Sequence, residues 1–205
     1  MTGLSEAMSE ALAPLASRLL CRLVAYASLV EDEVWVGLDP EAGAVLWTEF
    51  ADRYQFRAGT NPDRWPAIVE PSPSVAWDLG PIFTGGHPGG FAAGSRAVAA
   101  LVLGTLQDCT EWPETVVFHD WVHPSHLFRP HSIDEPEEVP GWDVGGLFPN
   151  GDYTIFVGRD YSFGILGHPW ERSLCVFGVG AVATFAARNR GILTKILRRD
   201  GRPAQ

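Results

Sequence analysis

The stretch DYTIFVGRDYSFGILGHPWERSLCVFG, residues 152–178, decides the fold class of this chain. Three runs within it are rich in β-branched and aromatic residues, a composition that favours β-strands. They predict strands over 152–158, 163–169 and 172–178. The links between the runs are short, whereas parallel neighbours need a crossover of about a dozen residues or more. The stretch therefore predicts three consecutive antiparallel strands.

The rest of the chain predicts helices before and after these strands. Their predicted ranges are 5–30, 41–55, 91–107 and 179–197. Further strands are predicted at 34–38, 74–79 and 115–121, and a long proline-containing loop at 123–150. Lys195, Arg198 and Arg199 would then lie at the C-terminal end of the last helix, where cations are favourable. This order of elements predicts an α+β fold, a mainly antiparallel sheet packed by N-terminal, central and C-terminal helices.

The acidic charge of the chain narrows the classes of partner. Its 205 residues carry a formal net charge of −10. Nucleic acids and anionic membranes are bound through basic patches, so neither is expected as a partner. A basic protein or a cationic ligand is electrostatically permitted. The expected partner is therefore a small molecule or a protein, and the sequence leaves the oligomeric state open.

Features of the N-terminal region and of the cysteines predict a cytoplasmic protein. Glu6 and Glu10 stand where a signal peptide carries cations, and the apolar run 19–30 is short and contains Arg22. We therefore expect neither a signal peptide nor a membrane span. The three cysteines are far apart and odd in number, which is typical of reduced thiols.

The segment HDWVHPSHLFRPH, residues 119–131, concentrates histidines around one aspartate. If the preceding strand ends there, as Pro124 favours, Asp120 and His123 can pair as an acid and a base. Asp120, His123 and His131 could also supply three ligands to a metal. Their spacing matches no strong metal signature, so no metal and no other cofactor is predicted. The alternative is that these histidines cap loops and bond to backbone carbonyls.

The stretch GHPWE, residues 167–171, is a second candidate for acid–base chemistry. A residue before proline is pushed to an extended backbone, so His168 should end a strand, and Pro169 favours a type I turn. In that turn the His168 imidazole and the Glu171 carboxylate could touch, and a nearby carboxylate favours a charged imidazole. One alternative is a strand that continues and turns Glu171 away. The other is a purely structural turn with Trp170 in the core.

Together these motifs resemble a family of bacterial proteins of unknown function that is frequent in actinobacteria. The family pattern reads Asp-Trp-x-His-Pro, Phe-x-Pro-His, Pro-x-Gly-Asp-Tyr-Tyr and Gly-x-x-Gly-His-Pro-Trp-Glu. The segments DWVHPSHLFRPH at 120–131 and FPNGDYTIFVGRDYSFGILGHPWERSLCVFG at 148–178 carry the resemblance, with departures at Val122, His126 and Thr154. The resemblance implies that the two segments belong to one unit and converge.

The length of the chain is that of one large domain, so residues 1–205 are predicted to form a single domain. Its parts would be an N-terminal helical segment at 1–40, a core at 45–180 that carries the family resemblance, and a C-terminal helix and tail at 181–205.

Convergence of the two segments predicts one site. The candidate acid–base residues are Asp120, His123, His168 and Glu171, and the candidate binding residues are Trp121, His131, Asp152, Tyr153 and Trp170. A pocket with aromatic walls and a few polar groups is typical of a binding site. We therefore predict a binding domain for a small molecule or a partner protein, helped by the acidic loop 132–143; an immunity-type protein that neutralises a toxin is one form. The alternative is a small enzyme that uses a histidine–carboxylate pair, with or without a metal.

Overall fold

A sheet of nine strands runs through the computed structural model, which describes residues 33–136 and 146–204. Every pair of neighbouring strands in these residues is antiparallel, in the order β1-β4-β3-β5-β6-β7-β2-β8-β9. The strands are β1 (Trp35–Gly37), β2 (Ser74–Asp78), β3 (Val116–His119), β4 (His126–Phe128), β5 (Thr154–Val157), β6 (Gly164–His168), β7 (Ser173–Phe177), β8 (Ile196–Arg199) and β9 (Arg202–Pro203). The sheet and its helices confirm the predicted α+β class. The expected helix 5–30 and residues 137–143 of the acidic loop lie outside the described residues.

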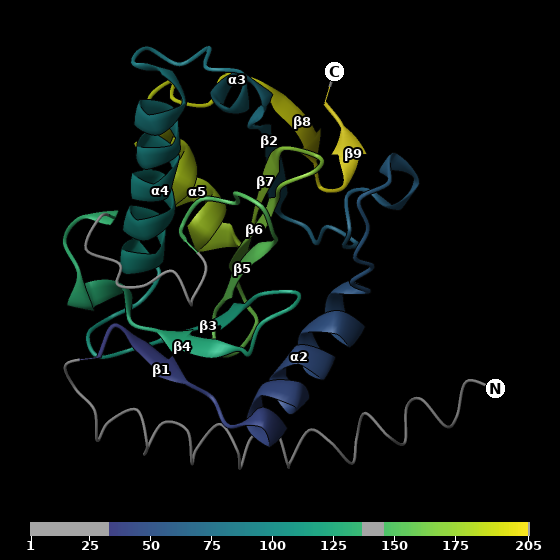
Figure 1. The fold of residues 1–205 in the computed structure, drawn as a ribbon, viewed down its shortest axis with the longest axis vertical. Coiled ribbons are helices and arrows are strands. Elements are labelled where there is room, and N and C mark those ends of the chain that lie inside the picture. The colour runs from purple at the N-terminus through teal and green to yellow at the C-terminus, as the bar shows by residue number, and fades with distance from the viewer. Residues whose placement is uncertain (1–32, 137–145, 205) are drawn as a thin grey trace.

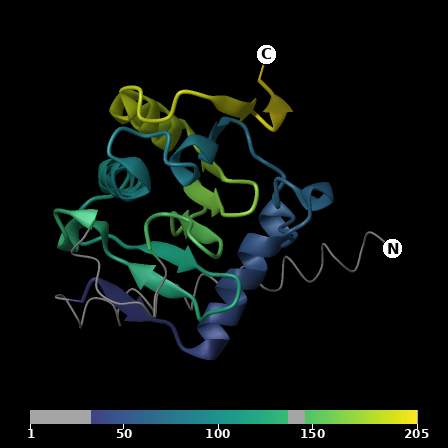
Figure 2. The ribbon, with the colours of Figure 1, turned by 45° about the horizontal axis from the view of Figure 1, so that its top comes forward.

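Helices cover both faces of the sheet (Figure 1). They are α2 (Pro40–Tyr54), α3 (Gly80–Phe83), α4 (Gly90–Asp108) and α5 (Val179–Asn189), with 3-10 turns η1 (Pro62–Arg64) and η2 (Pro130–Ser132). The turned view of Figure 2 shows α4 and α5 together on one side and α2 on the other. In the described part of the chain, no helix has the length and apolar character needed to cross a membrane.

The two covered faces give the sheet two cores. Alternate residues of a strand point to opposite faces. In β3, Val116 and Phe118 therefore pack with residues of α4 and α5, whereas Val117 packs with residues of α2. Because both faces are covered, β3, β5, β6 and β7 are buried along their whole length. This explains why they read in the sequence as continuous apolar runs rather than as alternating ones.

Tight links hold β5, β6 and β7 side by side, as the short connections predicted. The Gly158 N–H donates to the Phe163 carbonyl at 3.0 Å, and the Asp160 carboxylate accepts the Ser162 N–H at 3.0 Å. At the start of β6, a side chain on Gly164 would collide with the Phe177 ring and a neighbouring backbone carbonyl. Glycine is therefore required there because adjacent strands approach closely.

The predicted loop 123–150 is wrong in part, because it contains β4 and η2. The strand β4 is only three residues long and lies between β1 and β3. So short a strand carries no periodic signal of its own. Its place is set by pairing with Val116–Phe118, which lies only a short loop earlier in the chain, and with the distant segment Trp35–Gly37.

The predicted last helix, 179–197, is too long. The helix α5 ends at Asn189, where Arg190 adopts a left-handed backbone with φ of 41°. The Asn189 side chain then binds the backbone N–H and carbonyl of Leu193, each at 2.7 Å. The chain continues as β8, which pairs with β2. Lys195, Arg198 and Arg199 therefore do not lie at a helix C-terminus, because residues 196–199 form a strand that hydrogen-bonds to β2.

Candidate functional site

His168 ends β6, as the proline after it predicted, and its imidazole faces the interior. Its Nδ1 accepts the backbone N–H of Glu171 at 3.1 Å. The proton of the neutral ring is therefore on Nε2, which lies 3.3 Å from the hydroxyl oxygen of Tyr153. That hydroxyl in turn donates to the Gly59 carbonyl at 3.3 Å. His168 thus fixes both the turn that follows it and the ring of Tyr153.

Burial keeps His168 neutral, contrary to the expectation that a carboxylate would favour its charged form. The side chain is fully buried, and this loss of hydration lowers the pKa of His168 to about 4. The charge of Glu171 acts in the opposite direction but is the smaller effect. The Glu171 contact with the imidazole is made by a backbone N–H, not by the carboxylate. His168 and Glu171 therefore do not form the predicted acid–base pair.

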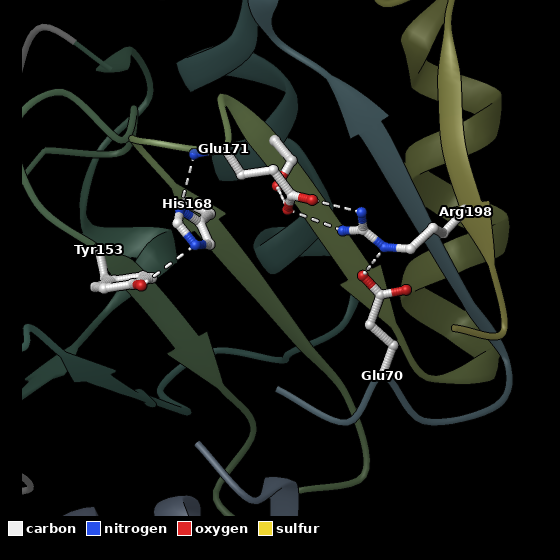
Figure 3. A network of polar contacts seen from close by, with 6 residues as sticks. Glu70, Tyr153, His168, Glu171 and Arg198 are labelled. Carbon is white, nitrogen blue, oxygen red and sulfur yellow. Dashed lines mark hydrogen bonds and ion pairs between the residues drawn. The ribbon is translucent and has the colours of Figure 1, made fainter. Parts of the chain in front are cut away.

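The Glu171 carboxylate instead joins a buried ion network (Figure 3). Its two oxygens accept hydrogen bonds from the Arg198 guanidinium at 2.5 and 2.9 Å, and one of them also accepts the Ser173 hydroxyl at 2.5 Å. The same guanidinium donates to Glu70 at 2.8 Å. Arg198 therefore ties β8 to the turn between β6 and β7 and to the segment before β2.

Three aromatic rings from the two motif segments pack against one another. Trp121, which follows β3, contacts Trp170 with ring centroids 6.0 Å apart at 89° and Tyr153 with centroids 6.1 Å apart at 83°. Tyr153 and Trp170 are 5.2 Å apart. Rings this close are in direct edge-to-face contact, so they form a continuous wall rather than an open cage. The segments around residues 121 and 170 thus converge, as the resemblance implied.

Asp120 and His123 form the predicted pair. The strand β3 ends at His119, and the Asp120 carboxylate accepts the His123 Nδ1–H at 2.9 Å. Its other oxygen accepts the Val122 N–H at 3.0 Å. The Asp120 side chain is buried, whereas that of His123 is 57% exposed. An oriented imidazole therefore faces solvent above a fixed carboxylate, an arrangement able to move a proton.

Asp152 adds a second carboxylate to this region. Its Oδ1 accepts the backbone N–H of Tyr153 at 2.7 Å. Burial raises the pKa of Asp152, and the negative charge of Asp120 raises it further, whereas His123 lowers it. Asp120, His123 and Asp152 therefore act on one another electrostatically.

A cavity of about 310 Å³ lies beside the pair, between residues 38–47 and the loop 120–125. The indoles of Trp47 and Trp121 line it, together with Asp120 and His123. The helix α2 begins at this border, where the Asp39 carboxylate caps it by accepting the backbone N–H groups of Glu41 and Ala42, each at 3.0 Å.

His131 lies apart from the other predicted residues. It belongs to η2, and its Nε2 contacts the carbonyl of Thr110 at 2.9 Å, beyond the end of α4. This matches the alternative that a histidine here bonds to a backbone carbonyl. Within residues 33–136 and 146–204, no three histidine, cysteine, aspartate or glutamate side chains gather closely enough to hold a metal ion. Asp120, His123 and His131 therefore do not form the ligand set that their types permitted.

Several residues of this region carry no signal in the sequence that would link them to the site. The sequence predicts Arg198 at a helix end, and it gives no pattern around Glu70, Trp65 and Gly59. Trp65 packs edge-to-face on His168 with centroids 5.5 Å apart. All four reach the site through strand pairing or through loops from other parts of the chain, which no local pattern reveals.

Comparisons with known proteins identify a relative of this chain and a family that matches it. "Uncharacterized protein YxiI" of Bacillus subtilis (strain 168) is 28% identical to this chain over 151 residues, which cover 70% of this chain and 87% of that protein. No solved structure matches the chain. A family match spans residues 38–182, which include the aromatic wall, Asp120, His123 and Glu171 but not Arg198. Because this match covers well over half of the chain, the protein belongs to the family described as "Protein of unknown function (DUF2716)".

Proposed function

We propose that this protein is a binding domain that recognises a small molecule or a partner protein. The contact region is the Trp121 surface, defined here as Trp121, Val122, His123, Asp152 and Trp170. A cytoplasmic location and a single-domain organisation belong to the same proposal. The scattered, odd-numbered cysteines support the location, and the one continuous sheet of the described residues supports the single domain.

The observation that carries the proposal is the exposure of a fixed aromatic ring. Trp121 is 42% exposed and the adjacent Val122 is 62% exposed. Tyr153, which is buried and bonded to His168, and Trp170 both contact the indole edge-to-face and hold it in place. Exposed apolar side chains that adjoin one another mark interaction sites, and tryptophan dominates the binding energy of many interfaces. A ring held in place before binding also loses little freedom when a partner arrives.

The first test maps where a fragment library binds. We expect the fragments with the strongest effects to shift the backbone NMR signals of residues 120–123, 152 and 170. In Trp121→Leu these shifts should fall by about tenfold at equal concentration, because an anchoring aromatic ring is lost. Trp112→Leu is the matched control, since Trp112 is 57% exposed but precedes β3, whereas Trp121 follows the other end of that strand. Fragments that bind only elsewhere, such as the cavity between Phe91 and Phe148, would contradict the proposal.

The Asp120–His123 pair supports a second candidate function, a small enzyme with the imidazole as acid or base. The specific support is the 2.9 Å hydrogen bond between a buried carboxylate and an exposed ring beside a cavity. A panel of chromogenic ester and phosphate substrates tests it. Turnover by the wild type should fall about 100-fold in both Asp120→Asn and His123→Gln, because acid–base groups of this kind contribute about that factor or more. Turnover that survives both substitutions would exclude the pair.

A further inference from the structure

We propose that the Trp121 surface takes a cationic side chain, an arginine or lysine, of a basic partner protein. The proposal rests on the binding function above and names the chemistry of the partner. Three independent features of the surface support it: a ring face without a cation from the described chain, two carboxylates beside it, and an apolar rim that extends beyond the size of one small ion.

The ring of Trp121 is suited to a cation from outside. Tryptophan is the strongest aromatic partner for a cation placed within about 6 Å of the ring. The protein itself uses this contact: Arg53 lies 5.2 Å from the Tyr161 ring centre and Arg172 lies 5.5 Å from that of Phe83. Among the described residues, the arginines placed over aromatic rings do not cover Trp121.

The carboxylates beside the ring favour positive charge. Asp120 is buried 2.9 Å from the His123 ring, and its negative charge acts on Asp152. The two acids repel each other in a partly desolvated place, so an arriving cation would lower the electrostatic energy of both. The net charge of −10 on the whole chain would also speed the approach of a basic partner.

The shape of the surface favours a side chain on a protein over a free small cation. Val122, next to Trp121, is 62% exposed and offers apolar area that a single small ion would leave in water. Protein interfaces combine such an apolar area with an arginine or aromatic anchor. An acidic immunity-type protein that covers a basic toxin is one form that such a pair could take.

The experiment compares three peptides of equal length in a Gly-Ser background, bearing arginine, its uncharged isostere citrulline, or glutamate. NMR titration gives the dissociation constant and the map of each. We expect the arginine peptide alone to bind and to shift residues 120–123, 152 and 170. Trp121→Leu should weaken its binding by about tenfold, and Asp152→Asn by about threefold, because each removes one attraction to the cation. Trp112→Leu should leave the dissociation constant unchanged. Urea unfolding of each variant confirms that it is folded.

Equal binding of the citrulline peptide would overturn the cationic partner while leaving the binding function in place. Arginine-peptide binding that Trp121→Leu leaves unchanged would show attraction to the net charge alone and would also overturn it. The last titration uses tetramethylammonium, a free small cation, in place of the peptides. If it binds at residues 120–123 and the arginine peptide does not, a free small cation replaces the protein partner. The binding function itself is tested separately by the fragment library, and it fails if the fragments bind only away from the Trp121 surface.

Discussion

Arg198→Met is expected to lower the free energy of unfolding by about 3–5 kcal/mol, the range for removing one partner of a buried ion pair. The Arg198 side chain is 15% exposed, and those of Glu70 and Glu171 are 0% and 9% exposed. Methionine has similar length but no charge, so it would leave two carboxylates without their cation and away from water. The loss arises mainly from those unpaired acids rather than from the attraction that disappears.

Urea unfolding at pH 7 measures this loss. The matched control is Lys195→Met, because Lys195 forms an ion pair with Asp78 at 2.9 Å but its side chain is 66% exposed. Such exposed pairs contribute about 1 kcal/mol or less, so the control should remain close to the wild type. Adding Glu171→Gln and Glu70→Gln to Arg198→Met should recover part of the stability, since no buried charge then lacks a partner. A loss for Arg198→Met no larger than that of the control would contradict the buried network.

Lowering the pH is expected to destabilise the protein at pH values well above the usual pKa of carboxylates, because His119 and His168 are buried in neutral form. Burial lowers the pKa of His119 to about 3 and that of His168 to about 4. In the unfolded chain each takes up its proton near pH 6.5. Between pH 6.5 and 4 the unfolded state therefore binds more protons than the folded state, and the free energy of unfolding falls as the pH falls.

The expected loss at pH 5, relative to pH 7.5, is about 2 kcal/mol for each histidine and about 4 kcal/mol for both. Glu70 has the opposite effect on the free energy of unfolding. Burial raises its pKa, so the folded state takes up this proton at a higher pH than the unfolded state does. Urea unfolding at several pH values in this range gives the slope of the free energy of unfolding against pH. His168→Gln keeps a donor toward Tyr153 but cannot titrate, so its loss between pH 7.5 and 5 should be about 2 kcal/mol smaller. An unchanged slope in this variant would show that His168 is not the acid-sensitive group.

Apart from the convergence that the family resemblance implied, the candidate site could be predicted from the sequence only where its residues are neighbours in the chain. Asp120 and His123 pair because Pro124 and the end of β3 bring positions three apart into contact. The same local reasoning led to the wrong partner for Glu171. A turn fixes where the backbone goes, but the carboxylate had a stronger partner in Arg198, 27 positions away. The preference of a charged group for a buried opposite charge cannot be read from spacing.

The order of the strands could likewise be predicted only where the strands are neighbours in the chain. Continuous apolar runs and short links were enough to predict β5, β6 and β7 as antiparallel neighbours. The place of β4 beside β1, and of β8 beside β2, was not predictable, because each of these two pairings joins segments separated by long stretches of chain. The 3-residue β4 and the strand after α5 acquire their conformation from those partners rather than from intrinsic preference.

The sequence by itself determined the class of fold and the three-stranded centre, and it offered the Asp120–His123 pair and the resemblance to a bacterial family of unknown function. These follow from local forces: side-chain shape, the restraint of proline and the length of a link. Only the tertiary structure decided that His168 is buried and neutral, that Glu171 turns to Arg198, and that Trp121 is held exposed by Tyr153 and Trp170. Burial and long-range ion pairing set these outcomes, because both depend on which distant segments the fold places around a side chain.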